Sequence, residues 1–326
     1  MERERIGEYR LVEEIARTAT STTYTAVHAV LPRRAVIRLM ESATHQIAVR
    51  ALREAYYLET LDHPAVARLF ESARLPDRRP WFARELVDGP TLAHQFPRAF
   101  EGESLELVRR IRDIAAILVH AHQRGVVHAG LRPDRIVLAR RAAGFTLCIC
   151  DWSDARAHDA AATAFIGSPE SWQYVAPELA GGDAIDDRAD VFALGVIAHK
   201  LITGVLPYER GALHARSSGE IVLPTEARAA EAPHELSALV DQMLAFDRWD
   251  RPSSTECHRE LSYLAESLAA STLRMRKPRW TPQTHLATPD HLAAAKATSL
   301  PRVPEDYAEL EIALSETPDP DNSTSA

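Results

Sequence analysis

The residues best placed for chemistry are a few polar side chains within or beside apolar runs. Asp151 closes the apolar run FTLCIC, and a carboxylate at the end of a strand can bind a metal ion or cap the following turn. Cys148 and Cys150 lie two apart in the same run, which places them on one face of a strand. Cys257 is distant in sequence, and a thiolate metal site needs more ligands than these residues supply. We therefore expect reduced thiols, with Asp151 as the candidate metal ligand.

A polar turn in IARTATSTTY is the second candidate, because its threonine and serine hydroxyls could donate hydrogen bonds to an anion. Ala16, Thr18 and Ser21 all carry a Cβ atom. The turn therefore cannot adopt a positive φ at low cost or lie as close to a phosphate as glycine would allow. An ordinary solvated hairpin is the better interpretation.

These residues must be positioned by strands near the N-terminus and by helices further along. Residues 9–40 alternate in hydrophobicity and carry β-branched side chains, which predicts three antiparallel strands. Residues 44–61 repeat apolar side chains at helical spacing, so Glu54 is expected on the inward face of a helix. The same period over residues 104–125 predicts one long helix.

Composition excludes several functional classes. The chain has 326 residues, 46% of them hydrophobic, which is enough for a substantial core. The net charge is −8, and arginine and glutamate are interspersed, so nucleic-acid binding is not expected. The sequence has neither an apolar run of about eighteen residues nor a basic and then apolar leader. We therefore expect a cytoplasmic protein with no membrane span.

The sequence changes character at about residue 271, where proline, threonine, serine and alanine become frequent. This composition predicts a mostly disordered tail over residues 271–326. The segments LRMRKPRW and EDYAELEIAL could each carry a short motif for a protein partner. A solvated tail is the better interpretation of both segments.

Several motifs share an order along the chain. The segment VVHAGLRPDRIVL, residues 126–138, resembles the catalytic loop H-R-D-L-K-P-x-N of bacterial eukaryotic-type serine/threonine protein kinases. AVIR, DWS and APE resemble the V-A-I-K, D-F-G and A-P-E motifs of the same family. The resemblance implies an α+β, bilobal fold in which an antiparallel sheet and one helix form the N-lobe (about 9–86) and the C-lobe (about 87–270) is mainly helical. Residues 1–8 would form an N-terminal arm.

The resemblance also implies roles for individual residues. Arg38 takes the position of the lysine that binds the ATP phosphates, and Glu54 that of its ion-pair partner. Asp151 takes the position of the magnesium ligand, and Glu85 opens the hinge that meets adenine. Arg84 takes the position that borders the adenine pocket; a shift of one residue in strand register would turn it outward.

Other matches are architectural. His128 matches the family's histidine and is expected to be a packed loop residue rather than a base. Asp190 matches the residue that braces the backbone of the catalytic loop. Glu178 and Arg251 match an ion pair that stabilises the C-lobe.

The departures gather at the expected reaction centre. Gly130 stands in place of the catalytic aspartate, and Arg135 in place of the metal-binding asparagine. Ala129 replaces the arginine that receives an activation-loop phosphate, so Thr163, Ser168 and Ser171 would lack the usual cation as phosphosites. A general base typically accelerates a reaction by about 10² to 10⁴, and Gly130 cannot act as one.

These losses predict a pseudokinase that regulates or scaffolds a protein partner, with weak or no binding of ATP and Mg²⁺. One alternative is a divergent active serine/threonine kinase that transfers the γ-phosphate of ATP to protein Ser/Thr, using Asp151 with one Mg²⁺ and Arg38 as the phosphate cation. Another is nucleotide sensing without transfer.

Overall fold

The computed structural model of the chain describes residues 5–95, 104–158, 160, 169–208, 210–218, 224–228 and 232–276. The predicted tail from residue 277 onward and the candidate phosphosites Thr163 and Ser168 lie outside these residues. No helix in the described ranges is both long and apolar enough to cross a bilayer.

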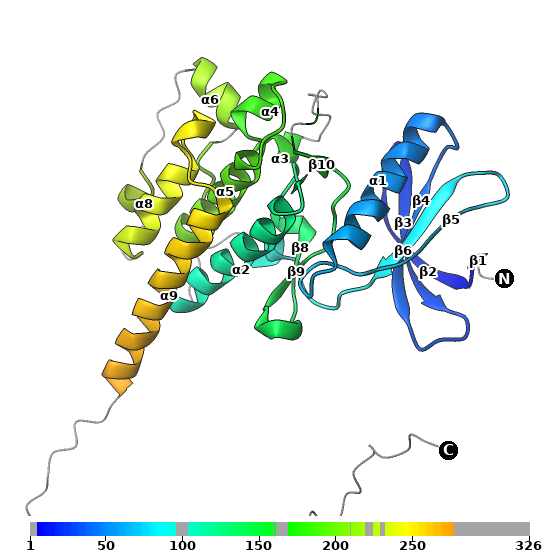
Figure 1. Cartoon of the computed structure of the whole chain (residues 1–326), viewed down its shortest axis with the longest axis horizontal. Coiled ribbons are helices and arrows are strands. Elements are labelled where there is room, and N and C mark those ends of the chain that lie inside the picture. The colour runs from blue at the N-terminus through cyan, green and yellow to red at the C-terminus, as the bar shows by residue number, and fades with distance from the viewer. Residues whose placement is uncertain are drawn as a thin grey trace, which may run out of the picture. The chain divides into compact units, whose positions relative to one another are not determined.

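The first lobe is a six-stranded antiparallel sheet of order β1-β2-β3-β4-β6-β5, and helix α1 lies across it (Figure 1). The elements are β1 (Arg5–Ile6), β2 (Tyr9–Arg17), β3 (Ser21–His28), β4 (Arg34–Met40), α1 (His45–Leu61), β5 (Leu69–Arg74) and β6 (Pro80–Glu85). The three strands and the helix predicted over residues 9–61 are therefore present.

The two faces of this sheet contact different parts of the protein, because successive side chains along a strand point to opposite faces. On β4, Ala35, Ile37 and Leu39 pack with Trp81 and Ala83 of β6 in a core that belongs to this lobe. The residues between them face the other way, toward α1 and the second lobe. Strand β4 therefore places Arg38 on the face of the sheet that borders the second lobe.

The second lobe is mainly helical. Its elements are η1 (Leu92–Gln95), α2 (Ser104–His122), β7 (Val126–Val127), η2 (Pro133–Arg135), β8 (Ile136–Leu138), η3 (Ala142–Gly144), β9 (Leu147–Ile149), β10 (Arg156–Ala157), α3 (Pro169–Trp172), α4 (Pro177–Gly181), α5 (Arg188–Thr203), α6 (Ala212–Ser218), α7 (Thr225–Arg228), α8 (His234–Met243), η4 (Arg248–Asp250) and α9 (Ser254–Arg276). Helix α5 is buried along most of its length, and it packs against α2 and α8.

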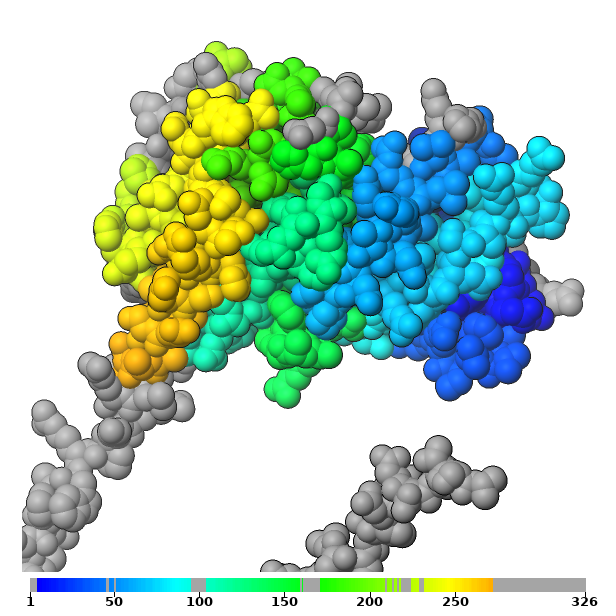
Figure 2. Space-filling model, viewed as in Figure 1, coloured from blue at the N-terminus to red at the C-terminus, as the bar shows by residue number. Residues whose placement is uncertain are grey.

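One helix end and one domain boundary differ from the expectation. Helix α2 stops at His122 rather than continuing to residue 125, because Gly125, with a φ of 69°, turns the chain into β7. Helix α9 lies along α2 (Figure 2) and continues to Arg276, past the domain end expected at residue 270. Alanine, leucine, methionine and arginine dominate its last turns, and all four favour helices.

The catalytic-type loop and the strand that leads to Asp151 lie between these helices and the first lobe. Strands β8 and β9 pair antiparallel, and β7 pairs with β10. The chain crosses from β9 to β10 through Asp151 and Asp154, so both carboxylates lie in a short connection between two small sheets.

Candidate functional site

Arg38 is the centre of a chain of ion pairs between the two lobes. Its Nη1 atom donates to both carboxylate oxygens of Glu54, at 2.8 and 2.6 Å, and its Nη2 atom donates to Oδ2 of Asp151 at 3.0 Å. Burial raises the pKa of Glu54, although the charge of Arg38 acts in the opposite direction. One guanidinium group thus connects β4, α1 and the residue that follows β9.

Asp151 uses both carboxylate oxygens within the protein. Oδ1 accepts a hydrogen bond from the backbone N–H of Ser153 at 2.9 Å and lies 3.9 Å from Nε of Arg135, while Oδ2 accepts from Arg38. Burial alone would raise the pKa of Asp151, but the guanidinium groups of Arg38 and Arg135 hold it well below its usual range. The carboxylate is therefore ionised and already faces two cations.

Arg135 and Asp154 fill the space beside Gly130. Nη2 of Arg135 donates to Oδ2 of Asp154 at 2.6 Å, and Arg135 is 8% exposed. A Cβ atom built on Gly130 would lie 2.7 Å from Nη1 of Arg135 and 2.8 Å from Oδ2 of Asp154. Asp154 was not among the predicted site residues. Its signal in the sequence is the second aspartate of DWSD, because a buried arginine needs a carboxylate nearby.

The polar turn between β2 and β3 satisfies its own hydrogen bonds. Oγ1 of Thr18 accepts from the backbone N–H groups of Ser21 at 3.0 Å and Thr20 at 3.3 Å, and it donates to the Ser21 carbonyl at 3.1 Å. The N–H of Thr18 also donates to the Ser21 carbonyl, at 2.8 Å. Two backbone N–H groups that an anion could otherwise use therefore point at a side chain of the same turn.

Strand β6, which leads into the expected hinge, places Arg84 and Glu85 on opposite faces of the sheet. Arg84 pairs with Val36 in the register of β4 and β6, so it shares the face of Arg38, and its charge helps to lower the pKa of Asp151. The register shift that would have turned Arg84 outward does not occur. Glu85 points away and binds both Nη atoms of Arg141, at 2.5 and 2.7 Å, while its N–H donates to the carbonyl of Arg68.

Asp190 holds the loop that contains Gly130. Its carboxylate accepts from the backbone N–H groups of His128 at 2.7 Å and Ala129 at 2.8 Å, and it lies 2.9 Å from Nε2 of His122. His128 is fully buried against the ring of Trp152, with ring centroids 4.5 Å apart, and burial lowers its pKa to about 4. The imidazole of His128 is therefore neutral at pH 7.

Comparison of the sequence with known protein families identifies the family of this domain. A model of the protein kinase domain matches residues 9–262. The chain belongs to the protein kinase family. This family typically uses ATP with Mg²⁺, and its bilobal fold is the one expected from the sequence.

The chain is similar to bacterial serine/threonine-protein kinases. It is 29% identical to Pkn1 of Myxococcus xanthus over 83% of this chain and 40% of that protein. It is 30% identical to PknJ of Mycobacterium tuberculosis over 73% of this chain and 41% of that protein. The chain thus spans about two fifths of the length of these curated relatives. The autoinhibited serine kinase domain of the giant muscle protein titin superimposes with a TM-score of 0.66 at 20% identity, covering 79% of this chain and 81% of that domain. This last likeness shows the fold alone.

Two further positions of this kinase domain are buried in the second lobe. Arg251 donates to both carboxylate oxygens of Glu178, at 2.7 and 2.9 Å, and its guanidinium lies over the ring of Phe192.

Ser171, one of the candidate phosphosites, is 2% exposed. A kinase that phosphorylates Ser171 would have to unpack it first, so burial adds to the missing cation at Ala129 as an obstacle to a phosphosite there.

Proposed function

We propose that this protein is a pseudokinase: a kinase-fold module that regulates or scaffolds a protein partner and binds ATP with Mg²⁺ weakly or not at all. The proposal rests on one observation. A chain of ion pairs runs from Glu54 through Arg38, Asp151 and Arg135 to Asp154, and its three middle residues take the positions at which the family binds phosphates and metal.

The residues at Asp151 do not fit a magnesium ion. Mg²⁺ requires oxygen ligands in a nearly octahedral arrangement, whereas the neighbours of this carboxylate include the guanidinium groups of Arg38 and Arg135. Breaking a buried ion pair by removing one partner costs about 3 to 5 kcal/mol. A ligand with a dissociation constant of 1 mM contributes only about 4 kcal/mol. Opening the ion pairs would therefore offset most of the free energy that a weakly bound nucleotide supplies.

Phosphoryl transfer depends on positioning and electrostatic stabilisation more than on covalent chemistry. Here Gly130 supplies no carboxylate, and the Arg135–Asp154 pair takes the space in which one would lie. The turn at Thr18 directs its hydroxyl to its own backbone. These changes affect the position of the base, the metal ligands and the turn that would contact the phosphates. None of the three is left intact to compensate for the loss of another.

The alternative is an active serine/threonine kinase, and the comparisons by themselves favour it, because the relatives carry that name. In this mechanism Arg38 would leave Asp151 and bind phosphate, and Asp151 would take one Mg²⁺. The geometry argues against it because both oxygens of Asp151 are already engaged within the protein, and Arg135 places a second cation 3.9 Å from Oδ1, where the Mg²⁺ would have to bind.

The wider biological setting is part of the proposal. The partner is a protein, since this chain keeps the family's fold while its departures from the family's motifs remove the chemistry. The interspersed charges do not favour nucleic acid as the partner. The composition supports a cytoplasmic protein with a solvated tail, in which LRMRKPRW and EDYAELEIAL are the segments to test as interaction motifs.

A thermal-shift panel tests the proposal. The full chain is melted with millimolar ATP, ADP and GTP, each with and without Mg²⁺ or Mn²⁺, and labelled ATP is used to detect transfer to the chain itself or to a generic substrate. We expect neither a shift nor transfer. Asp151→Ala is compared with Asp134→Ala, which removes an exposed carboxylate of the catalytic-type loop. Transfer that Asp151→Ala abolishes and Asp134→Ala preserves would establish the active kinase. A Mg-ATP shift without transfer would establish nucleotide sensing.

A further inference from the structure

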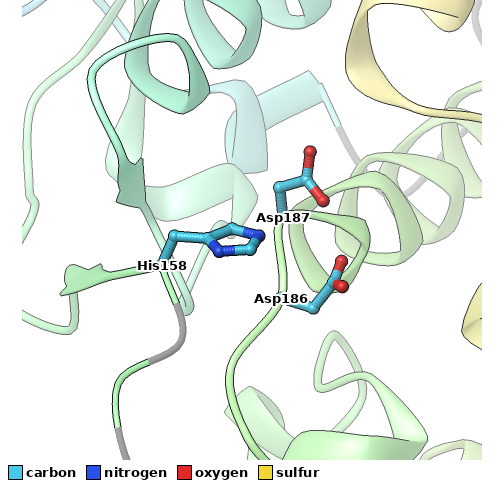
Figure 3. Close-up of side chains that lie close together, drawn as sticks. All are labelled: His158, Asp186 and Asp187. Carbon is cyan, nitrogen blue, oxygen red and sulfur yellow. The ribbon is translucent and has the colours of Figure 1, made fainter.

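A second cluster of metal-ligating side chains lies outside the cleft between the lobes. Within the described ranges, His158, Asp186 and Asp187 form the group of histidine and acidic residues whose ligand atoms all lie within 4.8 Å of one another. Figure 3 shows the ring of His158 pointing toward the two aspartates. His158 follows β10, and the aspartates directly precede α5. No residue of the Arg38 ion-pair chain belongs to this cluster.

The backbone holds these three residues in place. The N–H of His158 donates to the carbonyl of Gly125 at 2.9 Å. Oδ1 of Asp186 accepts from the N–H of Arg188 at 2.8 Å, and the carbonyl of Asp187 accepts from the N–H of Asp190 at 3.1 Å. The two segments are therefore fixed before any ion arrives, which lowers the entropic cost of binding.

The donor set indicates the class of ion. One imidazole and two carboxylates suit Zn²⁺, whereas Mg²⁺ and Ca²⁺ prefer oxygen alone. Tetrahedral zinc holds nitrogen and oxygen ligands at about 2.0 to 2.2 Å, which places two of its ligands about 3.3 to 3.6 Å apart. The three ligand atoms lie within 4.8 Å of one another, so rotation of the side chains by about 1 Å at their tips would bring them to that spacing, and His158 is exposed. With three protein ligands, water would complete the coordination.

The charges of the cluster favour a cation. Asp186 and Asp187 bring two carboxylates within 4.8 Å of each other, and a divalent ion between them would remove the repulsion between their charges.

The cluster also lies close to the residues that hold the loop containing Gly130. Oδ2 of Asp187 lies 3.8 Å from Nδ1 of His122, and Nε2 of that histidine lies 2.9 Å from Oδ2 of Asp190. Asp190 in turn accepts the N–H groups of His128 and Ala129. The hydrogen bond of Nδ1 of His122 is made with Oγ of Ser254 at 2.8 Å, so Asp187 lies beside this imidazole without a hydrogen bond to it.

We propose that His158, Asp186 and Asp187 bind one Zn²⁺ ion, which ties the segment after β10 to the start of α5. The ion acts as a structural staple between these two segments. This site is independent of the proposed pseudokinase function, since it uses neither nucleotide nor any residue of the cleft.

Zinc titration of the chelator-treated full chain tests the site, with a chromophoric chelator as competitor. Because other histidines and the cysteines could also bind zinc, the criterion is the difference between variants. His158→Ala should weaken the tightest zinc site at least about tenfold, since even an outer residue of a metal site is worth 10- to 100-fold. Asp186→Asn should do the same while it still accepts the N–H of Arg188. His234→Ala is the matched control, because His234 lies 3.0 Å from one exposed carboxylate, that of Glu226, and it should leave affinity unchanged.

A melting experiment gives a second readout. At a zinc concentration of about 100 times the dissociation constant, the wild type and His234→Ala should melt roughly 5 °C higher than without zinc, and His158→Ala should not. His158 is exposed, so the variant should melt near the wild type when zinc is absent. Equal zinc affinity in the wild type and His158→Ala would overturn the proposal. So would a stabilisation that millimolar Mg²⁺ reproduces and that depends on His158. Neither result bears on nucleotide binding.

Discussion

Replacing Arg38 by alanine tests the ion pairs between the lobes, and the same strand supplies the control. Arg38 and Arg34 both lie on β4, and each donates two hydrogen bonds to one carboxylate: Arg38 to Glu54 at 2.8 and 2.6 Å, Arg34 to Asp88 at 2.8 and 2.9 Å. The pairs differ in exposure. The side chains of Arg34 and Asp88 are 60% and 72% exposed, whereas those of Arg38 and Glu54 are 16% and 3% exposed.

The difference in burial sets the expected magnitudes. Arg38→Ala leaves the carboxylates of Glu54 and Asp151 without their shared cation, and such a loss costs about 3 to 5 kcal/mol of the free energy of unfolding. Arg34→Ala removes an exposed pair worth about 0 to 1 kcal/mol. In a domain of this size each kcal/mol lowers Tm by about 2 to 4 °C. We therefore expect Tm to fall by roughly 10 °C for Arg38→Ala and by at most about 4 °C for Arg34→Ala.

Urea unfolding at pH 7 measures both losses, and a third variant checks their cause. If an uncompensated buried charge produces the loss, Glu54→Gln in the Arg38→Ala background should recover part of the stability, with a coupling of about 0.5 to 3 kcal/mol. Equal losses for Arg38→Ala and Arg34→Ala would refute the reasoning. A double variant no more stable than Arg38→Ala would show that lost packing, rather than charge, is responsible.

Three further predictions concern the loop and the effect of pH. Gly130→Asp should destabilise the protein by about 1 to 3 kcal/mol and restore no phosphate transfer, because its Cβ would lie 2.7 Å from Nη1 of Arg135; a gain of transfer from labelled ATP would contradict this. The folded-state pKa of His128 is about 4, below the ordinary value of about 6.5, so the unfolded chain binds the proton first as pH falls. The contribution of neutral His128 to the free energy of unfolding is therefore complete above about pH 6.5, and about 3 kcal/mol of it is lost toward pH 4. Urea unfolding of His128→Phe over this range should lack that part of the decline, and an unchanged slope would exclude His128 as its source. Asp151 has a lowered pKa, so its contribution is complete above its unfolded value of about 3.8 and is lost as pH falls further; the stability difference between wild type and Asp151→Asn should therefore shrink below about pH 4, and a constant difference would argue against that shift.

The strands and the first helix could be predicted because their evidence is local. The alternation over residues 9–40 and the helical period of α1 are properties of neighbouring side chains, and together they turn Arg38 and Glu54 toward each other. The face of Arg84 followed in the same way from strand alternation once the register was known. Periodicity thus predicts which face of a regular element a side chain occupies, whereas the pairing of Arg38 with Glu54 is expected from the resemblance to the kinase family.

The partner of Arg135 could not be predicted in this way. Asp154 lies in the connection between β9 and β10, and only the folded loop brings it within 2.6 Å of the guanidinium. The burial of Ser171 has the same origin, because it depends on packing between segments far apart in the sequence. The zinc-ligand cluster also joins residues from two distant segments, and no spacing rule connects His158 with Asp186.

The structure makes the departures at the reaction centre dependent on one another. Gly130 leaves room for Arg135, Arg135 requires the carboxylate of Asp154, and Asp151 stays ionised through Arg38 and Arg135. A change at one position leaves a clash or an unpaired charge at the next, and buried unpaired charges are costly. Asparagine in place of Arg135, for example, would remove the cation beside Asp154 while Gly130 still supplied no carboxylate. If the protein is the pseudokinase that we propose, recovery of kinase chemistry would therefore need simultaneous changes at Gly130, Arg135 and Asp154.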